Sequence, residues 1–364
     1  MTVANKNARI RLNSFDFMKG IGIILVVVSH SFGRYSESSS PIIGIIMTCL
    51  MASKGLMPMF FIITGYSFRE TPLKKKLKKT FSELMMPYFI IMGTYAVLYP
   101  IANYSGYRSW TLAFDQAKRY VAAFLLGWTQ SGETFLDYRL AWCTAAWFLL
   151  ALFIAMNVLN LVLKMKKECQ RAICMILCLS MSWFLAEDVS LLFCIPQGLR
   201  AACYCYVGYL IKKYGIVERI VDNAWTYVIL LLIYFMEYKW GIIDMSQGIF
   251  GRPVLDFVGT SASGLLLMLI SIHISRKELR GLKWCSTIGM YSYWLICIHA
   301  IEMDVLPWYF LPLSMPDHLI IAFFIEILIK IVIMTVTCIL MKEIAKRRYR
   351  RRRLAAQRSA SRTS

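Results

Sequence analysis

The stretch FMKGIGIILVVVSHSF, residues 17–32, is predominantly apolar and carries a lysine near its beginning and a histidine near its end. Its composition predicts a membrane-spanning helix. Lys19 and His30 are eleven positions apart, or about three helical turns, so both side chains lie on one helix face roughly 16 Å apart along the axis. Ionisable side chains at membrane depth are costly, and a functional role is their default interpretation. Lys19 and His30 are therefore the first candidate site residues.

The rest of the chain has the same character, because 58% of its 364 residues are hydrophobic. Repeated apolar runs of nearly 20 residues predict an all-α polytopic integral membrane protein with about ten transmembrane helices. The ten predicted spans are 17–33, 42–68, 84–103, 144–163, 172–187, 190–211, 223–239, 254–274, 285–306 and 318–341.

The net charge of +20 comes from lysines and arginines that gather in every second connection. They occupy the N-terminus and the stretches TPLKKKLKKTF (71–81), KMKKECQR (164–171), KKYGIVER (212–219), SRKELRGLK (275–283) and KRRYRRRRLAAQR (346–358). Positively charged loops stay in the cytoplasm, so this pattern predicts that both termini are cytoplasmic. Membrane topology accounts for the basic composition without a nucleic-acid partner. We expect a membrane domain over 1–341 and a disordered basic cytoplasmic tail over 342–364.

The eleven cysteines lie mostly inside the predicted spans and show no paired zinc-type spacing, so we interpret them as packing residues and predict no metal site. Segment 104–143 is too long for a tight loop and contains a short apolar stretch, RYVAAFLLGW. Two interpretations stay open for this segment: an acceptor-facing lid or a plain interfacial helix.

The span 285–306 carries His299 in its outer half, with Glu302 one turn later on the same face. A carboxylate beside an imidazole fixes the tautomer and supports the imidazolium, so the pair is a candidate general base. An ordinary polar contact between helices is the other interpretation. For His30, a hydrogen bond to nearby backbone is the alternative to catalysis. For Lys19, the alternative is a lysine that extends to the inner surface beside Asp16.

Three further spans contain charged residues. Glu326 and Lys330 are four positions apart, a spacing that favours a self-neutralising structural pair. Arg200 and Lys54 have no partner within their own helices. Such cations bind either an anionic ligand such as phosphate or a carboxylate on another helix.

Four stretches, in order along the chain, resemble the membrane acyltransferase 3 family. DFMKGIGIILVVVSH (16–30) resembles the signature helix of the family, with an acid, a basic residue followed by glycine, and a later histidine. GLMPMFFIITGYSF (55–68), AAWFLLALF (145–153) and IGMYSYWLICIHA (288–300) resemble three further family motifs. Two departures are a threonine, Thr64, in place of the usual serine, and no arginine directly before Pro87 and Tyr88. Lys78 and Lys79 lie about two turns earlier and offer positive charge instead.

The resemblance implies a cell-membrane enzyme that moves an acyl group, commonly acetyl or succinyl, from acyl-coenzyme A (acyl-CoA) to a hydroxyl of a glycan or lipid-linked acceptor. Acyl-CoA would be a co-substrate, and no bound cofactor is expected. Its partners would be acyl-CoA, the acceptor and membrane lipids. The expected catalytic residues are His30, Lys19, His299 and Glu302, and the expected donor-binding residues are Lys74, Lys75, Lys78, Lys79 and Arg200. An exporter or flippase of a polar lipid or glycan is the competing interpretation, because ten spans with buried charges suit a transporter equally well.

Overall fold

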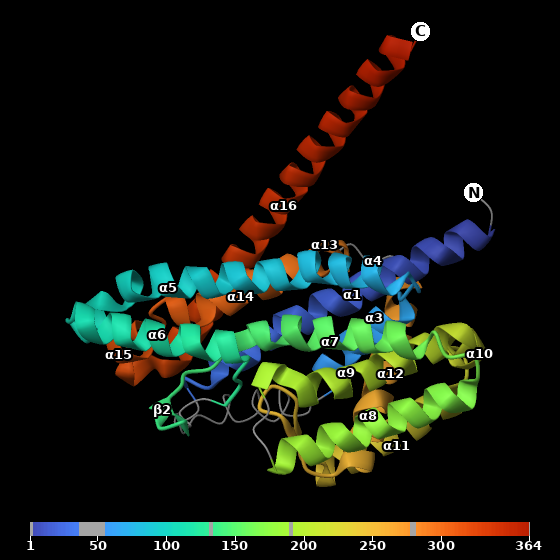
Figure 1. Cartoon of the computed structure of the whole chain (residues 1–364), viewed down its shortest axis with the longest axis horizontal. Coiled ribbons are helices and arrows are strands. Elements are labelled where there is room, and N and C mark those ends of the chain that lie inside the picture. The colour runs from blue at the N-terminus through green and yellow to red at the C-terminus, as the bar shows by residue number, and fades with distance from the viewer. Residues whose placement is uncertain (1–2, 36–54, 131–133, 189–191, 277–281, 364) are drawn as a thin grey trace.

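In the computed structural model, helices make up 82% of the chain (Figure 1), which confirms the all-α prediction. The structure describes residues 3–35, 55–130, 134–188, 192–276 and 282–363. The helices are, in chain order, α1 (Val3–Phe32), α3 (Leu56–Tyr66), α4 (Leu73–Thr80), α5 (Met86–Tyr107), α6 (Trp110–Leu126), α7 (Trp147–Val162), α8 (Glu168–Asp188), α9 (Ile195–Lys213), α10 (Ile216–Ile220), α11 (Ala224–Trp240), α12 (Pro253–Arg276), α13 (Leu282–Met290), α14 (Ser292–Val305), α15 (Phe310–Ser314) and α16 (Leu319–Thr363).

Shorter elements join these helices. They are a π-helical turn, η1 (Phe81–Met85), and three 3₁₀ turns, η2 (Thr144–Ala146), η3 (Leu192–Cys194) and η4 (Pro316–His318). Two small antiparallel ribbons pair β1 (Thr134–Phe135) with β2 (Tyr138–Arg139) and β3 (Ile243–Asp244) with β4 (Ile249–Phe250).

Six helical segments among the described residues are long and apolar enough to cross a membrane. They are Ser14–Phe32, Leu73–Tyr107, Thr144–Val162, Glu168–Ala186, Pro253–Arg276 and Pro316–Arg347. The protein is therefore a multi-pass membrane protein, and six of the ten predicted spans coincide with these segments. The other four predicted spans overlap α3, α9, α11 and the pair α13 and α14, and part of span 42–68 lies outside the described residues.

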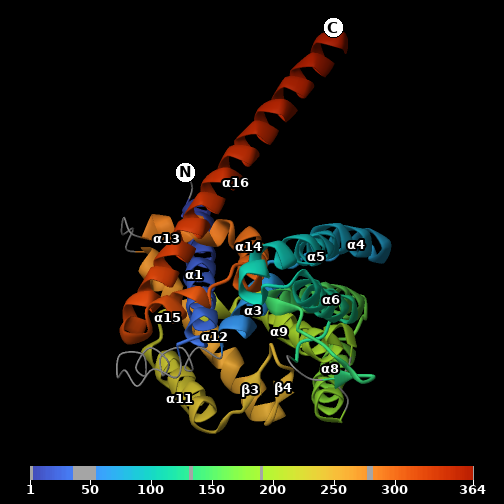
Figure 2. The same ribbon diagram turned by 90° about the vertical axis from the view of Figure 1, so that its left-hand side faces the viewer.

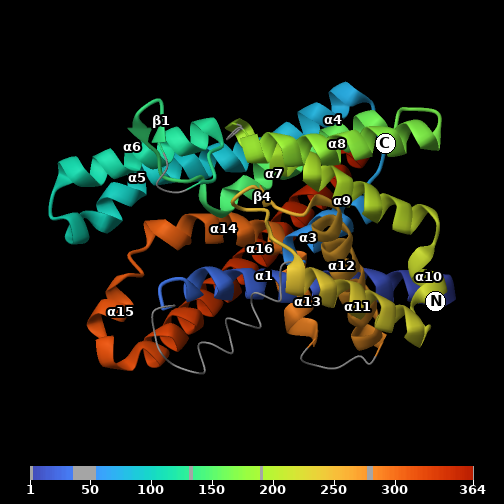
Figure 3. The ribbon, with the colours of Figure 1, turned by 90° about the horizontal axis from the view of Figure 1, so that it is seen from below.

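The quoted stretch lies in α1, which is the central helix of the part of the chain that carries the candidate site. It packs against α3, α12, α13, α14 and α16 (Figure 2). Figure 3 shows α14 between α1 and the antiparallel pair of α5 and α6. This arrangement brings the C-terminal half of α1 beside α14 although about 270 residues separate them in the sequence.

Segment 104–143 contributes α6, which folds back along α5 (Figure 1). Arg108 adopts a left-handed conformation, with φ of 49°, and ends α5. The Ser109 hydroxyl then accepts a hydrogen bond from Leu112 N and caps α6. The turn aligns Tyr120 of α6 with Tyr95 and Tyr99 of α5, at ring-centroid distances of 4.8 and 4.9 Å.

The last helix, α16, leaves the body of the protein and carries the C-terminus away from it (Figures 1 and 2). It continues as helix through the basic segment to Thr363, where the sequence led us to expect a disordered tail. Arginine, alanine and lysine are good helix formers, and the segment has no proline or glycine to stop propagation from the buried part of α16.

Two glycines allow α1 and α13 to cross at backbone contact. A Cβ atom added at Gly20 would overlap the carbonyl oxygen of Cys285, and one added at Gly289 would overlap the carbonyl oxygen of Asp16. Small residues let helix backbones approach closely in membrane proteins, where apolar surfaces alone give little association energy. The same kind of contact recurs between α3 and α9 at Gly65 and Gly208.

We predict that Gly20→Ala destabilises the protein by about 3 kcal/mol, because the added methyl group must separate α1 from α13. Gly93→Ala is the matched control, since a Cβ atom there meets no described residue within 4 Å and alanine is the better helix former. Thermal unfolding in detergent should show a clearly lower melting temperature for Gly20→Ala and an unchanged or higher one for Gly93→Ala. Equal melting temperatures would contradict this close crossing.

Candidate functional site

Two histidines from distant parts of the sequence meet inside the helix bundle, near the C-terminal end of α1. His30 is in the last turn of α1, and His299 is in the middle of α14. Their ring centroids are 5.3 Å apart, and the ring of Trp142 lies 6.3 Å from that of His30. Close packing of α1 against α14 thus creates a pair of imidazoles inside the protein.

His299 is held by Glu302, as the sequence predicts. The distance from His299 Nδ1 to Glu302 Oε1 is 2.7 Å, and both residues are buried. Trp308 Nε1 donates to the other carboxylate oxygen of Glu302, Oε2, at 2.7 Å. His299 Nε2 is buried and has no hydrogen-bond partner among the described residues. With the proton on Nδ1 pointing to Glu302, Nε2 carries the free lone pair, which is the arrangement of a general base.

Four buried or half-buried polar side chains surround this pair. The predicted contact of Glu326 with Lys330 is confirmed, with 2.9 Å between Oε1 and Nζ. Each of the two side chains also contacts other polar groups. Arg34 Nη1 and the Tyr35 hydroxyl also donate to Glu326, at 3.1 and 3.0 Å. Lys330 Nζ lies 3.6 Å from Glu302 Oε1. Two acids and two bases thus form one network that contacts the His299–Glu302 pair.

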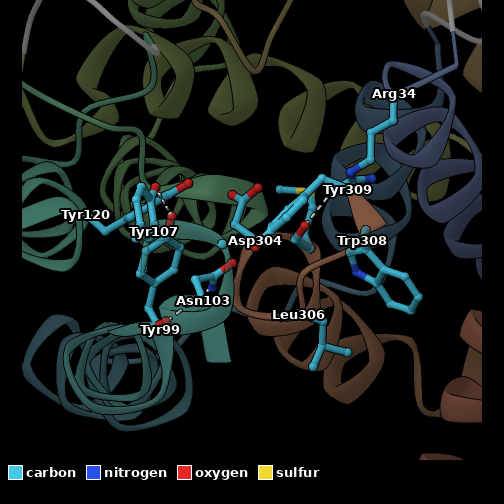
Figure 4. Close-up of a pocket in the computed structure, with 11 residues that line it drawn as sticks. Arg34, Tyr99, Asn103, Tyr107, Tyr120, Asp304, Leu306, Trp308 and Tyr309 are labelled. Carbon is cyan, nitrogen blue, oxygen red and sulfur yellow. Dashed lines mark hydrogen bonds between the residues drawn. The ribbon is translucent and has the colours of Figure 1, made fainter. Parts of the chain in front are cut away.

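A cavity of about 360 Å³ lies on the side of the histidines near the end of α1 (Figure 4). We name it the outer pocket. It is lined by Arg34, Tyr99, Asn103, Gly106, Tyr107, Tyr120, Met303, Asp304, Leu306, Trp308 and Tyr309. Figure 4 shows Tyr99, Tyr107 and Tyr120 on one side, Arg34 and Trp308 on the other, and Asp304 between them.

Asp304 is joined to the predicted lid segment, because Trp142 Nε1 donates to its Oδ2 at 3.1 Å. Segment 104–143 therefore supplies Tyr107 and Tyr120 to the outer pocket, and its Trp142 lies beside His30. This placement favours the interpretation of the segment as part of the site.

A second cavity, of about 240 Å³, lies on the opposite side of the histidines, and we name it the inner pocket. It is lined by Lys19, Ile23, Val26, Met57, Phe60, Ile63, Thr64, Phe148, Leu152, Ser292, Tyr293 and Ile296. Most of these side chains are apolar, and Lys19 is the one charged group among them.

The two pockets lie on either side of the histidine pair along the same two helices. Val26 of the inner pocket is one turn before His30 on α1, and Arg34 of the outer pocket follows His30 by four positions, in the turn that ends α1. On α14, Ile296 is one turn before His299, and Met303 is one turn after it. Residues three or four apart lie on one helix face, so both helices place a histidine between the two cavities.

Lys19 does not reach the histidines and instead lies at the far side of the inner pocket. It pairs with Asp16 at 2.7 Å, as the sequence allowed, and its side chain is 26% exposed. The lysine thus both lines a cavity and has a partner on its own helix.

The expected donor-binding residues fall into two separate places. Lys74, Lys75, Lys78 and Lys79 are exposed on α4, whereas Lys76 is buried, with its Nζ 3.8 Å from the ring centroid of Phe68. Arg200 is fully buried in α9, where its Nη2 donates to Pro253 O and its guanidinium lies over the ring of Phe250. Lys54 lies outside the described residues.

Four site residues were not singled out from the sequence: Arg34, Tyr35, Asp304 and Trp308. Each one lies just beyond a recognised helix or at its end, where a charged or aromatic residue is expected from membrane topology alone. The sequence feature that could have identified two of them is their distance from the histidines. Arg34 follows His30 by four positions, and Asp304 follows His299 by five.

No group of three or more histidine, cysteine or acidic side chains in the described part of the chain is arranged to hold a metal ion. The site therefore offers two imidazoles, one of them fixed by a buried carboxylate, between an apolar cavity and a polar aromatic one. Such an arrangement suits removal of a proton from a hydroxyl, or nucleophilic attack by an imidazole on a thioester.

Comparison with known proteins agrees with this chemistry. The model of one family, described as an acyltransferase domain, matches residues 12–343, which include every helix of the site. Comparison with curated proteins and with solved structures gave no match. Because the family model covers nearly the whole chain, the protein belongs to the acyltransferase 3 family of membrane O-acyltransferases.

Proposed function

We propose that this protein transfers an acyl group, in the first instance acetyl, from acyl-CoA to a hydroxyl of a cell-envelope glycan or a lipid-linked acceptor. The observation that carries the proposal is the pair of facing imidazoles, His30 and His299, between two cavities of different chemical character. A transferase needs two substrates to meet at one reactive group, and the two cavities provide a place for each.

The inner pocket suits the donor. Its apolar wall of isoleucine, valine, methionine and phenylalanine side chains accommodates an acyl thioester and the adjoining pantetheine arm. Lys19 lies at its far side, where a cation attracts a polyanionic donor. The exposed lysines of α4, namely Lys74, Lys75, Lys78 and Lys79, offer a surface for the phosphates of coenzyme A. Arg200 is not among the residues that line this pocket, so it has no role in the proposed donor path.

The outer pocket suits a hydroxyl-bearing acceptor. Asp304, Asn103 and Arg34 supply hydrogen-bond donors and acceptors, while the tyrosines and Trp308 supply flat aromatic surfaces. An acceptor in this pocket approaches the histidine pair from the side opposite to the donor.

In the proposed reaction, His30 takes the proton of the acceptor hydroxyl while the hydroxyl oxygen attacks the thioester carbonyl carbon. The carbon–sulfur bond then breaks, the acyl group stays on the acceptor oxygen, and the coenzyme A thiolate leaves and recovers the proton. His299, oriented by Glu302, has its ring centroid 5.3 Å from that of His30 and stabilises the imidazolium that forms there. A short-lived acyl group on His30 is the alternative path with the same overall balance.

We further propose ten membrane crossings with both termini in the cytoplasm. The start of α1, the basic helix α4 and the connection of α7 to α8 lie at one end of the bundle, and the turn between α5 and α6 lies at the other (Figure 1). The first end carries most of the lysines and is the side from which cytosolic acyl-CoA would enter.

His30→Ala should abolish transfer, a loss of about 10²-fold to 10⁴-fold, because it removes the base. The measurement is release of free thiol from acetyl-CoA by purified protein in lipid, with and without a membrane glycan extract. His318→Ala is the matched control, since His318 is exposed in η4 and lines neither pocket. It should keep wild-type activity. Wild-type turnover in folded His30→Ala would remove His30 from the mechanism.

Lys19→Ala should lower kcat/KM for acyl-CoA about tenfold, the value of one charge-assisted contact, while Lys19→Arg should keep most of the activity. Asp16→Asn serves as the control because it removes the 2.7 Å partner and leaves the cation in place. Unchanged kinetics in Lys19→Ala would mean that Lys19 only pairs with Asp16 at the inner surface.

The topology predicts that Cys169, exposed at the start of α8, reacts with a membrane-impermeant maleimide only after cells are made permeable. Ser105→Cys, at the exposed end of α5, should react in intact cells. Labelling of both positions from the same side would refute the proposed orientation of α5 and α8.

A further inference from the structure

The carboxylate of Glu302 receives contacts from three residues, and only His299 lies on its own helix. Trp308 Nε1 donates to Oε2 at 2.7 Å, and Lys330 Nζ approaches Oε1 to 3.6 Å. Oε1 is the same oxygen that contacts His299 Nδ1 at 2.7 Å. Lys330 comes from α16, far from the four stretches that resemble family motifs. The orientation of the His299–Glu302 pair therefore depends on the last helix.

Pairing with Glu326 is not enough to explain a lysine at this place. Glu326 already receives Arg34 at 3.1 Å and the Tyr35 hydroxyl at 3.0 Å. Without Lys330, one cation, Arg34, would remain for two buried carboxylates, Glu302 and Glu326. Burial of an unpaired charge is costly, so the second carboxylate, Glu302, needs the lysine.

The lysine is also fixed in position. It is 1% exposed, and its Nζ donates to the Ser31 hydroxyl at 2.9 Å in addition to its contact with Glu326. The ring of Trp308 lies beneath it, with Nζ 4.9 Å from the ring centroid. Ser31 is next to His30 in α1, so Lys330 joins the helices of both histidines.

We propose that Lys330 is a positioning residue of the acyl transfer: through Glu302 it holds His299 in the orientation and tautomer that the reaction needs. This inference rests on the proposed function, because it assigns to Lys330 a role in the work of His299. Trp308 supports the same carboxylate from the acceptor side, since its ring lines the outer pocket while its Nε1 binds Glu302.

The test is a double-mutant cycle between Lys330→Met and Glu302→Gln, measured as thiol release from acetyl-CoA with a glycan extract. If Lys330 acts through Glu302, Lys330→Met lowers the apparent kcat about tenfold in the wild-type background, a part of the 10²-fold to 10⁴-fold contribution of a general base. In the Glu302→Gln background, Lys330→Met should lower the apparent kcat by less than about a further twofold, because the carboxylate through which Lys330 acts is already removed. The KM for acetyl-CoA should stay within about twofold, since Lys330 lines neither large pocket.

Two further variants separate positioning from folding. Thr337→Val removes a buried polar side chain of α16 whose hydroxyl donates within its own helix to Ile333 O, so it should keep nearly full kcat. The double variant Glu326→Gln, Lys330→Met removes both charges of the i,i+4 pair and should recover the melting temperature lost in Lys330→Met alone. Its kcat should remain low, because Glu302 still lacks its lysine.

Equal fold losses for Lys330→Met in both backgrounds would overturn the inference. Recovery of kcat in Glu326→Gln, Lys330→Met would overturn it as well, and would leave a purely structural pair. An inactive wild-type protein would instead count against the proposed function itself, and an active wild type with a multiplicative cycle would count against the role of Lys330 alone.

Discussion

The site depends on the burial of a carboxylate, Glu302, inside a membrane protein. A buried charge must be hydrogen-bonded and neutralised, and here that requirement is met by groups from three places in the chain: His299 on α14, Trp308 after α14, and Lys330 on α16. The second carboxylate, Glu326, links the same lysine to Arg34 and Tyr35 at the end of α1. The helices that form the site are thus held together by the charges that orient its imidazoles.

The helical repeat explains how one site faces two cavities. α1 and α14 pack side by side, and in α14, as in α1 with the turn that follows it, an inner-pocket residue, a histidine and an outer-pocket residue follow one another at intervals of three or four. The glycine contacts between α1 and α13 hold α1 close to its neighbours. In this account, donor and acceptor reach the histidine pair from opposite sides, and the protein need only bring them together and move a proton.

The sequence predicts those contacts of the site whose two residues lie in the same helix. The pairs His299 with Glu302, Glu326 with Lys330 and Asp16 with Lys19 follow from spacing within a helix, and the family follows from four short stretches. Contacts between helices have no such signal. The approach of His30 to His299 and the place of Arg34 in the network depend on packing of segments about 270 to 290 residues apart. The reach of Lys330 to Glu302 depends on packing of α16 against α14, which are separate helices. Likewise the division of predicted span 285–306 into α13 and α14, and the helical course of residues 342–363, depend on context beyond the apolar runs.

The proposed function requires the acyl donor to reach the histidine pair through the inner pocket. A structure of the protein in lipid with a non-hydrolysable acetyl-CoA analogue tests this most directly. We expect density for the pantetheine arm along Lys19, Phe60 and Phe148, with the acyl end between Val26 and the rings of His30 and His299. Density for the analogue beside Arg200, or in the outer pocket with the inner pocket empty, would contradict it.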